Sequence, residues 1–326
     1  MRQEPPTIRR PLEPRVVTVE QLAALVKTPV NKLERLVLDA PTLYTSFEVP
    51  KPNGKTRTIQ PPARPLRDLQ RTLLDALQEC IRYPRWMMGG VPKRSIFDHA
   101  QPHVGRKMVA TFDVKAFYPS TKPAMVRPVL ERLGLGDAAA DAVLRLVTKD
   151  DELPQGGPTS GFLANLALEP ADRTIDWLCR KHGLNFTRYV DDMALSGDTD
   201  LTKFHGTIIE AVNKCGYEVA PEKIRYMGRN VTQLVTKLRV NDKMRPTRAF
   251  MAEVKADIWE CLNAGAAAVA AERGVQLYHL KNSLTGKVSH IRRADREAGE
   301  KLRGMLCGVD WVKDERIESA EPATAV

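Results

Sequence analysis

The chain has 326 residues, and its 50 basic and 40 acidic residues give a formal net charge of +10, which favours a polyanionic partner although ordinary enzymes can be equally basic. Five cysteines are scattered without a C-x-x-C spacing, which argues against a zinc ribbon and against a secreted disulfide scaffold. No charged-then-apolar leader and no apolar stretch of about eighteen residues is present, so we expect a cytoplasmic protein without membrane contact.

The first hundred residues combine an irregular segment, helices and a hairpin. Four prolines in residues 1–15 predict an irregular arm, and helical spacing follows over 19–26 and 32–38. The strands expected at 44–49 and 57–59 flank Pro52-Asn53-Gly54, a turn signal that predicts a β-hairpin. Leucines at helical spacing predict a core-facing helix over 66–81.

Two β-rich runs near the middle of the chain carry acidic residues. Asp113 ends the run that starts at Met108, where a buried strand would favour an apolar residue. Asp191 and Asp192 form a pair between the apolar runs 186–190 and 193–196, and such a pair costs stability unless a cation compensates it. Magnesium prefers oxygen ligands and suits this position. The competing interpretations are a surface turn for the pair and a turn cap before Pro119 for Asp113.

A glycine- and proline-rich loop lies between these acidic runs. Residues 153–161 read Leu-Pro-Gln-Gly-Gly-Pro-Thr-Ser-Gly and precede a helical run over 162–168. Such a loop entering a helix exposes backbone N–H groups that can receive a nucleotide or a template strand. Before it, residues 125–147 read as helices interrupted at Gly134 and Gly136.

The last third of the chain is predicted to be mostly helical. We expect helices over 201–215, 249–272, 276–283 and 290–306, a strand over 233–240, and a disordered tail over 316–326. Between residues 223 and 248, eight basic residues face a single acid, Asp242, which favours a phosphate-binding surface, with a solvated face as the alternative. These are Lys223, Arg225, Arg229, Lys237, Arg239, Lys243, Arg245 and Arg248.

In their order and spacing, these blocks resemble the motifs of a reverse transcriptase, specifically of the bacterial retron type. The run around Asp113 resembles polymerase motif A, Leu153-Pro154-Gln155-Gly156 resembles motif B, Tyr189-Val190-Asp191-Asp192 resembles motif C, and Pro221-Glu222-Lys223 resembles motif D. The residues His99-Ala100-Gln101-Pro102-His103 resemble the family's Asn-Ala-x-x-His block, with His99 in place of asparagine. Val231-Thr232-Gln233 falls at the family's Val-Thr-Gly element, with Gln233 replacing the glycine.

The resemblance implies an α+β fold shaped like a right hand, with fingers, a ferredoxin-like palm and a mostly helical thumb. The N-terminal arm and fingers would take residues 1–110, the palm with inserted finger and palm helices residues 111–228, and the thumb residues 229–315, before the tail over 316–326. This length leaves no room for an added ribonuclease H, endonuclease or integrase domain.

The resemblance also implies an RNA-directed DNA polymerase that uses two Mg²⁺ ions, for which Mn²⁺ can substitute. Asp113, Asp191 and the backbone carbonyl of Val114 would hold the ions, and Asp192 would support them electrostatically. Residues expected at the incoming deoxynucleoside triphosphate are Arg57, Lys55, Gln155, Lys223 and Tyr118, the last as a steric gate against ribose, or alternatively as a core aromatic. Residues expected at RNA are Gln233, Lys237, Arg239, Lys243, Arg245 and Arg248.

The partners implied by the resemblance are a cognate structured noncoding RNA, its DNA product, deoxynucleoside triphosphates and an effector protein from the same operon. The product would be single-stranded DNA joined to RNA, made within an antiphage defence system. Two alternatives stay open: a defence-associated reverse transcriptase of another class with a different template, and a catalytically silent nucleic-acid-binding scaffold.

Overall fold

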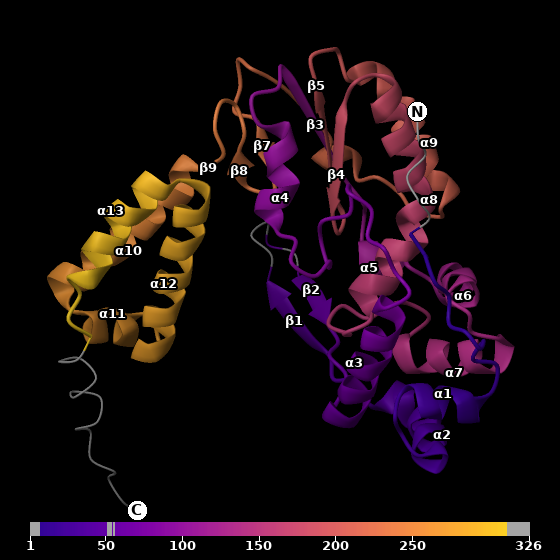
Figure 1. Cartoon of the computed structure of the whole chain (residues 1–326). Helices are drawn as coiled ribbons and strands as arrows, with labels where there is room; N and C mark the ends of the chain where they lie inside the picture. The colour runs from indigo at the N-terminus through magenta and orange to yellow at the C-terminus, as the bar shows by residue number, and fades with distance from the viewer. Residues whose placement is uncertain (1–6, 51–53, 55, 312–326) are drawn as a thin grey trace, which may run out of the picture. The chain divides into compact units, whose positions relative to one another are not determined.

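The computed structural model describes residues 7–50, 54 and 56–311, which fall into two compact units (Figure 1). The first unit comprises Met1–Pro102 and Lys107–Met227, and the second comprises His103–Arg106 with the chain from Gly228 onward. The expected turn residues Pro52 and Asn53, the side chain of Lys55 and the tail over 316–326 lie outside the described residues.

A four-stranded sheet forms the centre of the first unit. Its strand order is β4-β5-β3-β6, and β5 runs antiparallel to both β3 and β4. Apolar residues in the middle of β3 and β5 are buried, as the sequence predicts for core strands. The strands are β3 (Met108–Asp113), β4 (Asn185–Tyr189), β5 (Asp192–Gly197) and β6 (Arg225–Gly228).

Helices of the first unit pack around this sheet and around each other, with the long helix α8 contacting β4, α5, α6 and α9. The interruption predicted near Gly134 and Gly136 is confirmed, since α6 and α7 are separate helices and Gly136 precedes α7. The helices are α1 (Val19–Leu25), α2 (Val30–Asp39), α3 (Arg64–Gln78), α4 (Ile96–Ala100), α5 (Phe117–Ser120), α6 (Pro123–Arg132), α7 (Asp137–Val147), α8 (Ser160–Lys181) and α9 (His205–Lys214).

The predicted hairpin near residue 50 and the irregular N-terminal arm also occur in the first unit. Strands β1 (Phe47–Pro50) and β2 (Thr56–Ile59) pair antiparallel. The described part of the arm has no long helix or strand, but backbone hydrogen bonds hold it on the unit: Arg9 N–H donates to the Cys80 carbonyl and Leu12 N–H to the Leu133 carbonyl, both at 2.9 Å.

The second unit has its own small sheet and a helical bundle. Strands β7 (Leu234–Val235), β8 (Leu238–Arg239) and β9 (Arg245–Pro246) form a three-stranded sheet. Four helices bury a separate apolar core that includes Ile258, Leu284 and Ile291. They are α10 (Arg248–Ala264), α11 (Ala266–Glu272), α12 (Leu277–Ala294) and α13 (Arg296–Cys307).

Four expected elements of this region differ from the structure. The strand expected over 233–240 is a hairpin, because Thr236 and Lys237 take positive φ values of 45° and 66° and turn the chain back. The helix expected over 249–272 breaks at Gly265, whose φ of 88° is not helical. The helix predicted to end near residue 283 continues to Ala294, since apolar residues as far as Ile291 face the core. The helix expected over 290–306 therefore begins only at Arg296, after Asp295 caps its N-terminus.

Within the described parts of the chain, no helix is long and apolar enough to cross a bilayer.

Candidate active site

Three aspartates meet at one edge of the central sheet in the first unit. Asp113 is the last residue of β3 and lies opposite Asp192, the first residue of β5, in the strand register. Asp191 precedes Asp192, and its backbone carbonyl accepts a 2.9 Å hydrogen bond from the Val114 N–H. The hairpin β4–β5 therefore places the acidic pair beside the acid of β3, as the sequence pattern predicts.

The segment that follows Asp113 is fixed by backbone hydrogen bonds on both sides of Val114. The Ala220 N–H donates to the Asp113 carbonyl and the Lys115 N–H donates to the Glu218 carbonyl, each at 2.8 Å. Val114 itself is buried. These bonds fix the backbone on both sides of Val114, whose carbonyl is the metal ligand implied by the family resemblance.

Negative charge is crowded at Asp191. Burial raises the pKa of this carboxyl above its ordinary value of 3.8, and the neighbouring Asp113 carboxylate raises it further, while Lys223 and Arg188 oppose the shift. An acid whose charged form is disfavoured in the protein alone gains most from a nearby cation. The electrostatics of the edge therefore favour cation binding.

A lysine compensates part of this charge. Lys223 is the last residue of the short helix η4 (Pro221–Lys223). Its Nζ donates a hydrogen bond to Asp113 Oδ1, with 2.6 Å between the two atoms. Partial burial would lower the pKa of Lys223, but the hydrogen bond and the charges of Asp113 and Asp191 raise it overall. Lys223 is thus a protonated ammonium group placed directly on the carboxylate edge.

The donor set at this edge fits a hard divalent cation bound in an open site. Asp113, Asp191 and Asp192 offer only oxygen ligands, which Mg²⁺ prefers. Within residues 7–50, 54 and 56–311, no group of three or more His, Cys, Asp or Glu side chains forms a cluster that could hold a metal ion by itself. An ion held by one or two carboxylates that completes its shell with substrate phosphates and water agrees with this arrangement.

The turn that carries the acidic pair has a strained backbone. Val190 has a φ of 60°, the left-handed region that β-branched residues rarely occupy. Gly89 packs directly against it, because a Cβ at Gly89 would lie 2.4 Å from the Val190 nitrogen and 2.6 Å from Val190 Cγ2. The conformation of this turn therefore has to be held by its surroundings.

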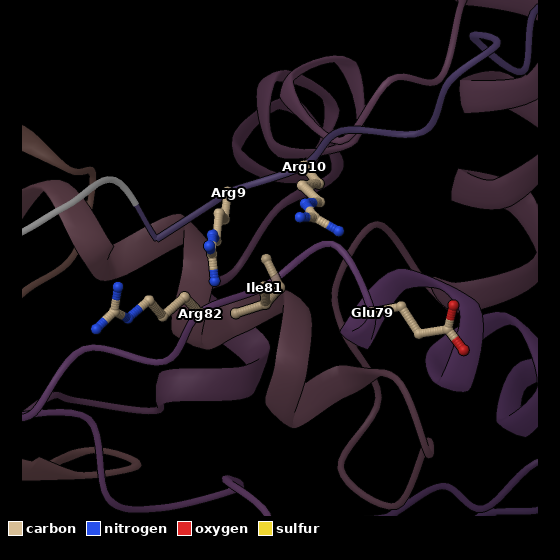
Figure 2. Close-up of a pocket in the computed structure, with 5 residues that line it drawn as sticks. All are labelled: Arg9, Arg10, Glu79, Ile81 and Arg82. Carbon is tan, nitrogen blue, oxygen red and sulfur yellow. The ribbon is translucent and has the colours of Figure 1, made fainter.

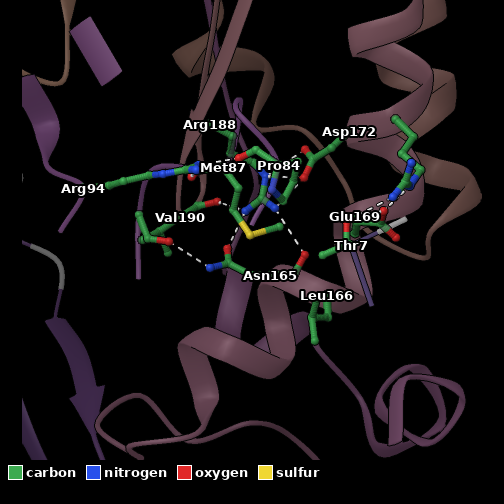
Figure 3. Close-up of polar contacts among 12 residues, drawn as sticks. Thr7, Pro84, Met87, Arg94, Asn165, Leu166, Glu169, Asp172, Arg188 and Val190 are labelled. Atoms are coloured by element: carbon green, nitrogen blue, oxygen red, sulfur yellow. Dashed lines mark hydrogen bonds and ion pairs between the residues drawn. The ribbon is translucent and has the colours of Figure 1, made fainter. Parts of the chain in front are cut away.

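A fully buried arginine, Arg188, is hydrogen-bonded to this turn (Figure 3). The Arg188 Nη1 donates to the Val190 carbonyl at 2.6 Å and to Asn165 Oδ1 at 2.7 Å. Its Nη2 and Nε donate to both carboxylate oxygens of the equally buried Asp172 at 2.6–3.0 Å. The amide of Asn165 in turn donates to the Gly89 carbonyl at 2.8 Å. The network links α8, the turn and the segment at Gly89.

The backbone of Arg188 is clamped as well. Its N–H donates to the Trp86 carbonyl and its carbonyl accepts from the Met88 N–H, both at 2.7 Å. Arg94 holds that partner segment through the carbonyls of Tyr83, Pro84 and Met87 (Figure 3). This network was not predicted from the sequence, although Arg188, like Asp113, is a charged residue in an otherwise apolar strand.

The residues expected at the nucleotide also lie in the first unit. Tyr118 belongs to the short helix α5. Burial raises the pKa of the Tyr118 hydroxyl, and the nearby negative charge of Asp191 raises it further. A Cβ built on Gly161 at the start of α8 would lie 3.6 Å from the Tyr118 hydroxyl. The Gln155 carbonyl accepts from the Gln60 N–H at 2.7 Å, which joins the motif B loop to the end of the β1–β2 hairpin. Arg57 is exposed on β2.

The basic residues expected at RNA lie in the second unit. Lys237, Lys243, Arg245 and Arg248 are exposed, and Arg239 lines two adjacent pockets of about 280 and 320 Å³. Gln233 is fully buried, and its Nε2 donates to the Arg106 carbonyl at 3.1 Å. A direct contact between the Gln233 side chain and RNA would require this segment to open.

Comparison with known proteins identifies the family. The model of the reverse transcriptase (RNA-dependent DNA polymerase) family matches residues 49–238. The retron Mx65 reverse transcriptase of Myxococcus xanthus is 32% identical over 309 residues, which cover 87% of this chain and 70% of that protein. The chain belongs to the retron reverse transcriptases. It is an RNA-directed DNA polymerase.

Other retron reverse transcriptases are similar over much of their length. The retron Se72 enzyme of Salmonella heidelberg is 25% identical, with 92% of this chain and 81% of that protein covered. Among solved structures, telomerase from Candida albicans has a TM-score of 0.46 at 11% identity, covering 83% of this chain and 59% of that chain. In the present chain, Asp113, Asp191 and Asp192 lie within residues 49–238, which the family model matches. Lys243, Arg245 and Arg248 lie after the matched residues.

Proposed function

We propose that this retron reverse transcriptase copies part of a cognate structured noncoding RNA into single-stranded DNA that remains joined to RNA, within an antiphage defence system. The observation that carries the catalytic part is the meeting of Asp113, Asp191 and Asp192 at one sheet edge. Membership of the retron family supports the template and the product.

In the proposed mechanism, the primer's terminal hydroxyl attacks the α-phosphate of a deoxynucleoside triphosphate and pyrophosphate leaves. Asp113, Asp191 and the Val114 carbonyl would hold two Mg²⁺ ions, with Mn²⁺ as a substitute, and Asp192 would add negative charge beside them. When bound by these residues, the ions would supply Lewis-acid chemistry, which activates a hydroxyl nucleophile and stabilises charge on the leaving group. Because the protein contributes no covalent nucleophile, its own part is positioning and electrostatics.

Side chains around the carboxylates would position the nucleotide. Lys223 holds its proton on Nζ at the carboxylate edge, where it can neutralise or protonate the leaving pyrophosphate. Arg57 would neutralise phosphate charge, a role the sequence also suggests for Lys55, and Gln155 would line the pocket. The bond between the Gln155 loop and Gln60 supports this proposal, since it joins the two segments that would contact the nucleotide.

The proposed architecture is a right hand. Fingers and palm would lie in the first unit, with the sheet β4-β5-β3-β6 as the palm, and the second unit would be the thumb. The exposed basic residues Lys237, Lys243, Arg245 and Arg248, together with Arg239, would follow the RNA backbone, while buried Gln233 would support their segment from inside.

Tyr118→Ala is expected to let the enzyme incorporate ribonucleotides. The ring would otherwise clash with a ribose 2′-hydroxyl, and its removal opens space beside Gly161. Primer extension with single ribonucleoside triphosphates should show discrimination against ribose falling by roughly 10-fold or more, as expected when a steric contact of 1–3 kcal/mol is lost. Tyr118→Phe is the matched control and should keep the discrimination. Unchanged sugar selection in the alanine variant would place Tyr118 in the core instead.

The proposed product can be tested on nucleic acid that co-purifies with the protein expressed from its native locus. A denaturing gel with and without ribonuclease should show a discrete DNA band that shortens with ribonuclease and is absent from Asp191→Asn. Structured RNA without DNA in either sample would favour a silent scaffold. Heterogeneous DNA without attached RNA would point to a defence-associated reverse transcriptase with a different template.

A further inference from the structure

Three arginines line a pocket in the first unit, and none of them belongs to the catalytic edge. The pocket has a volume of about 530 Å³ and is lined by Arg9, Arg10, Glu79, Ile81 and Arg82 (Figure 2). It lies where the N-terminal arm crosses the segment that follows helix α3.

Backbone pairing brings these arginines together from two distant parts of the sequence. The N–H groups of Arg9 and Arg10 both donate to the Cys80 carbonyl, at 2.9 and 3.3 Å. The Arg82 N–H donates to the Thr7 carbonyl at 2.8 Å, and Ile8 forms an antiparallel bridge with Ile81. The backbone positions from which the three side chains extend are thus set by hydrogen bonds between the arm and the segment after α3.

The charges in this pocket are uncompensated within the described part of the chain. Arg9, Arg10 and Arg82 are exposed, and no acidic side chain among residues 7–50, 54 and 56–311 forms an ion pair with any of them. Glu79 contributes to the lining, but Figure 2 shows its carboxylate directed away from the arginines. Like charges that line one pocket repel each other, and a bound anion relieves that repulsion.

We propose that this pocket binds phosphate groups of the RNA backbone. It would be an RNA contact separate from the three aspartates of the carboxylate edge and from the exposed basic residues of the second unit. The inference rests on the proposed function, in which structured RNA is the partner. Guanidinium groups match phosphate oxygens through paired hydrogen bonds. Among the described residues that line the pocket, Ile81 alone is apolar, whereas the centre of a protein interface is apolar and poor in charge.

The test compares the full-length triple variant R9Q/R10Q/R82Q with the wild type. The probe is a fluorescein-labelled RNA hairpin of about 30 base pairs, and the measurement is anisotropy over a range of salt concentrations. Loss of three phosphate contacts should weaken binding at least about 10-fold at 0.1 M salt and make the log–log salt slope shallower by about 2 to 3. Thermal unfolding checks that the variant is folded.

The matched control is K27Q/K32Q/R35Q, which removes the same number of charges from exposed positions of the first unit outside the pocket. It should keep affinity and slope close to those of the wild type. A folded R9Q/R10Q/R82Q protein with a wild-type slope would overturn the proposal, as would equal losses in both variants, which would reflect net charge alone. If R9Q/R10Q/R82Q keeps its RNA binding but loses binding of a polyglutamate peptide, the proposal is overturned and the ligand of the pocket is an acidic protein.

Primer extension by the wild-type enzyme on a short RNA template separates failure of the pocket from failure of the proposed function. No DNA synthesis by the wild type, together with a salt slope that depends on the three arginines, would count against the proposed carboxylate mechanism and template and would leave the pocket proposal standing. Normal DNA synthesis with an unchanged slope in R9Q/R10Q/R82Q would overturn the pocket alone.

Discussion

Asp191→Asn is expected to reduce DNA synthesis by about 10³-fold or more while leaving the protein folded. The substitution removes one negative oxygen from the carboxylate edge, where electrostatic stabilisation supplies most of the expected rate enhancement. Primer extension on an RNA template measures the loss. Glu210→Gln is the matched control, because Glu210 pairs with Lys214 on the exposed face of α9 and should keep full activity. Near-wild-type synthesis by Asp191→Asn would exclude the carboxylate mechanism.

The same substitution should stabilise the protein when no metal is added. Because the pKa of Asp191 is raised above 3.8, the folded state binds more protons than the unfolded state between that value and the raised one. The wild-type free energy of unfolding therefore falls as pH rises through this window, and an uncharged asparagine avoids the loss. Thermal unfolding at neutral pH in EDTA should give a higher Tm for Asp191→Asn, and added Mg²⁺ should raise the Tm of the wild type more.

Arg188→Met is expected to cost about 3–5 kcal/mol of stability and to abolish most DNA synthesis. It leaves the fully buried carboxylate of Asp172 without its partner and removes the donor to the Val190 carbonyl. Denaturant unfolding measures the first effect and primer extension the second. Arg35→Met is the control, since its ion pair with Asp39 is largely exposed and should contribute little.

The double variant Arg188→Met with Asp172→Leu separates stability from positioning. Replacing both buried charges by apolar groups should recover much of the lost stability. Activity should remain low, because the Val190 carbonyl and Asn165 Oδ1 still lack their donor and the acidic turn is free to relax. A double variant that recovers stability and activity together would reduce Arg188 to a folding role.

The sequence identified the carboxylate edge because its signals are local. Asp113 is at the end of one apolar strand, and Asp191 and Asp192 lie where the chain turns between two others. Strand pairing is enough to bring these positions together. Val114 and Lys223 followed from motif resemblance, and the structure adds the bond between Lys223 and Asp113 across 110 residues of sequence. The roles of these residues in catalysis remain predictions.

Features that depend on long-range packing could not be predicted from the sequence. The hairpin at Thr236 and Lys237 uses positive φ values without the Asn-Gly or Asp-Gly signal that normally marks such a turn. The burial of Gln233 depends on its bond to the Arg106 carbonyl, from a segment more than a hundred residues away. The partners of Arg188 on α8 were likewise invisible to strand and helix periodicity.

The contact between Gly89 and Val190 limits how the turn that carries Asp191 and Asp192 can change during evolution. Any side chain at Gly89 would collide with the backbone nitrogen of Val190, so repacking at position 190 alone cannot make room for it. Conversely, a residue larger than valine at position 190 would have to fit against the backbone of Gly89, which already lies close to the Val190 side chain. Viable mutational paths through this region therefore require both segments to move in concert, and we expect the two positions to covary among related sequences.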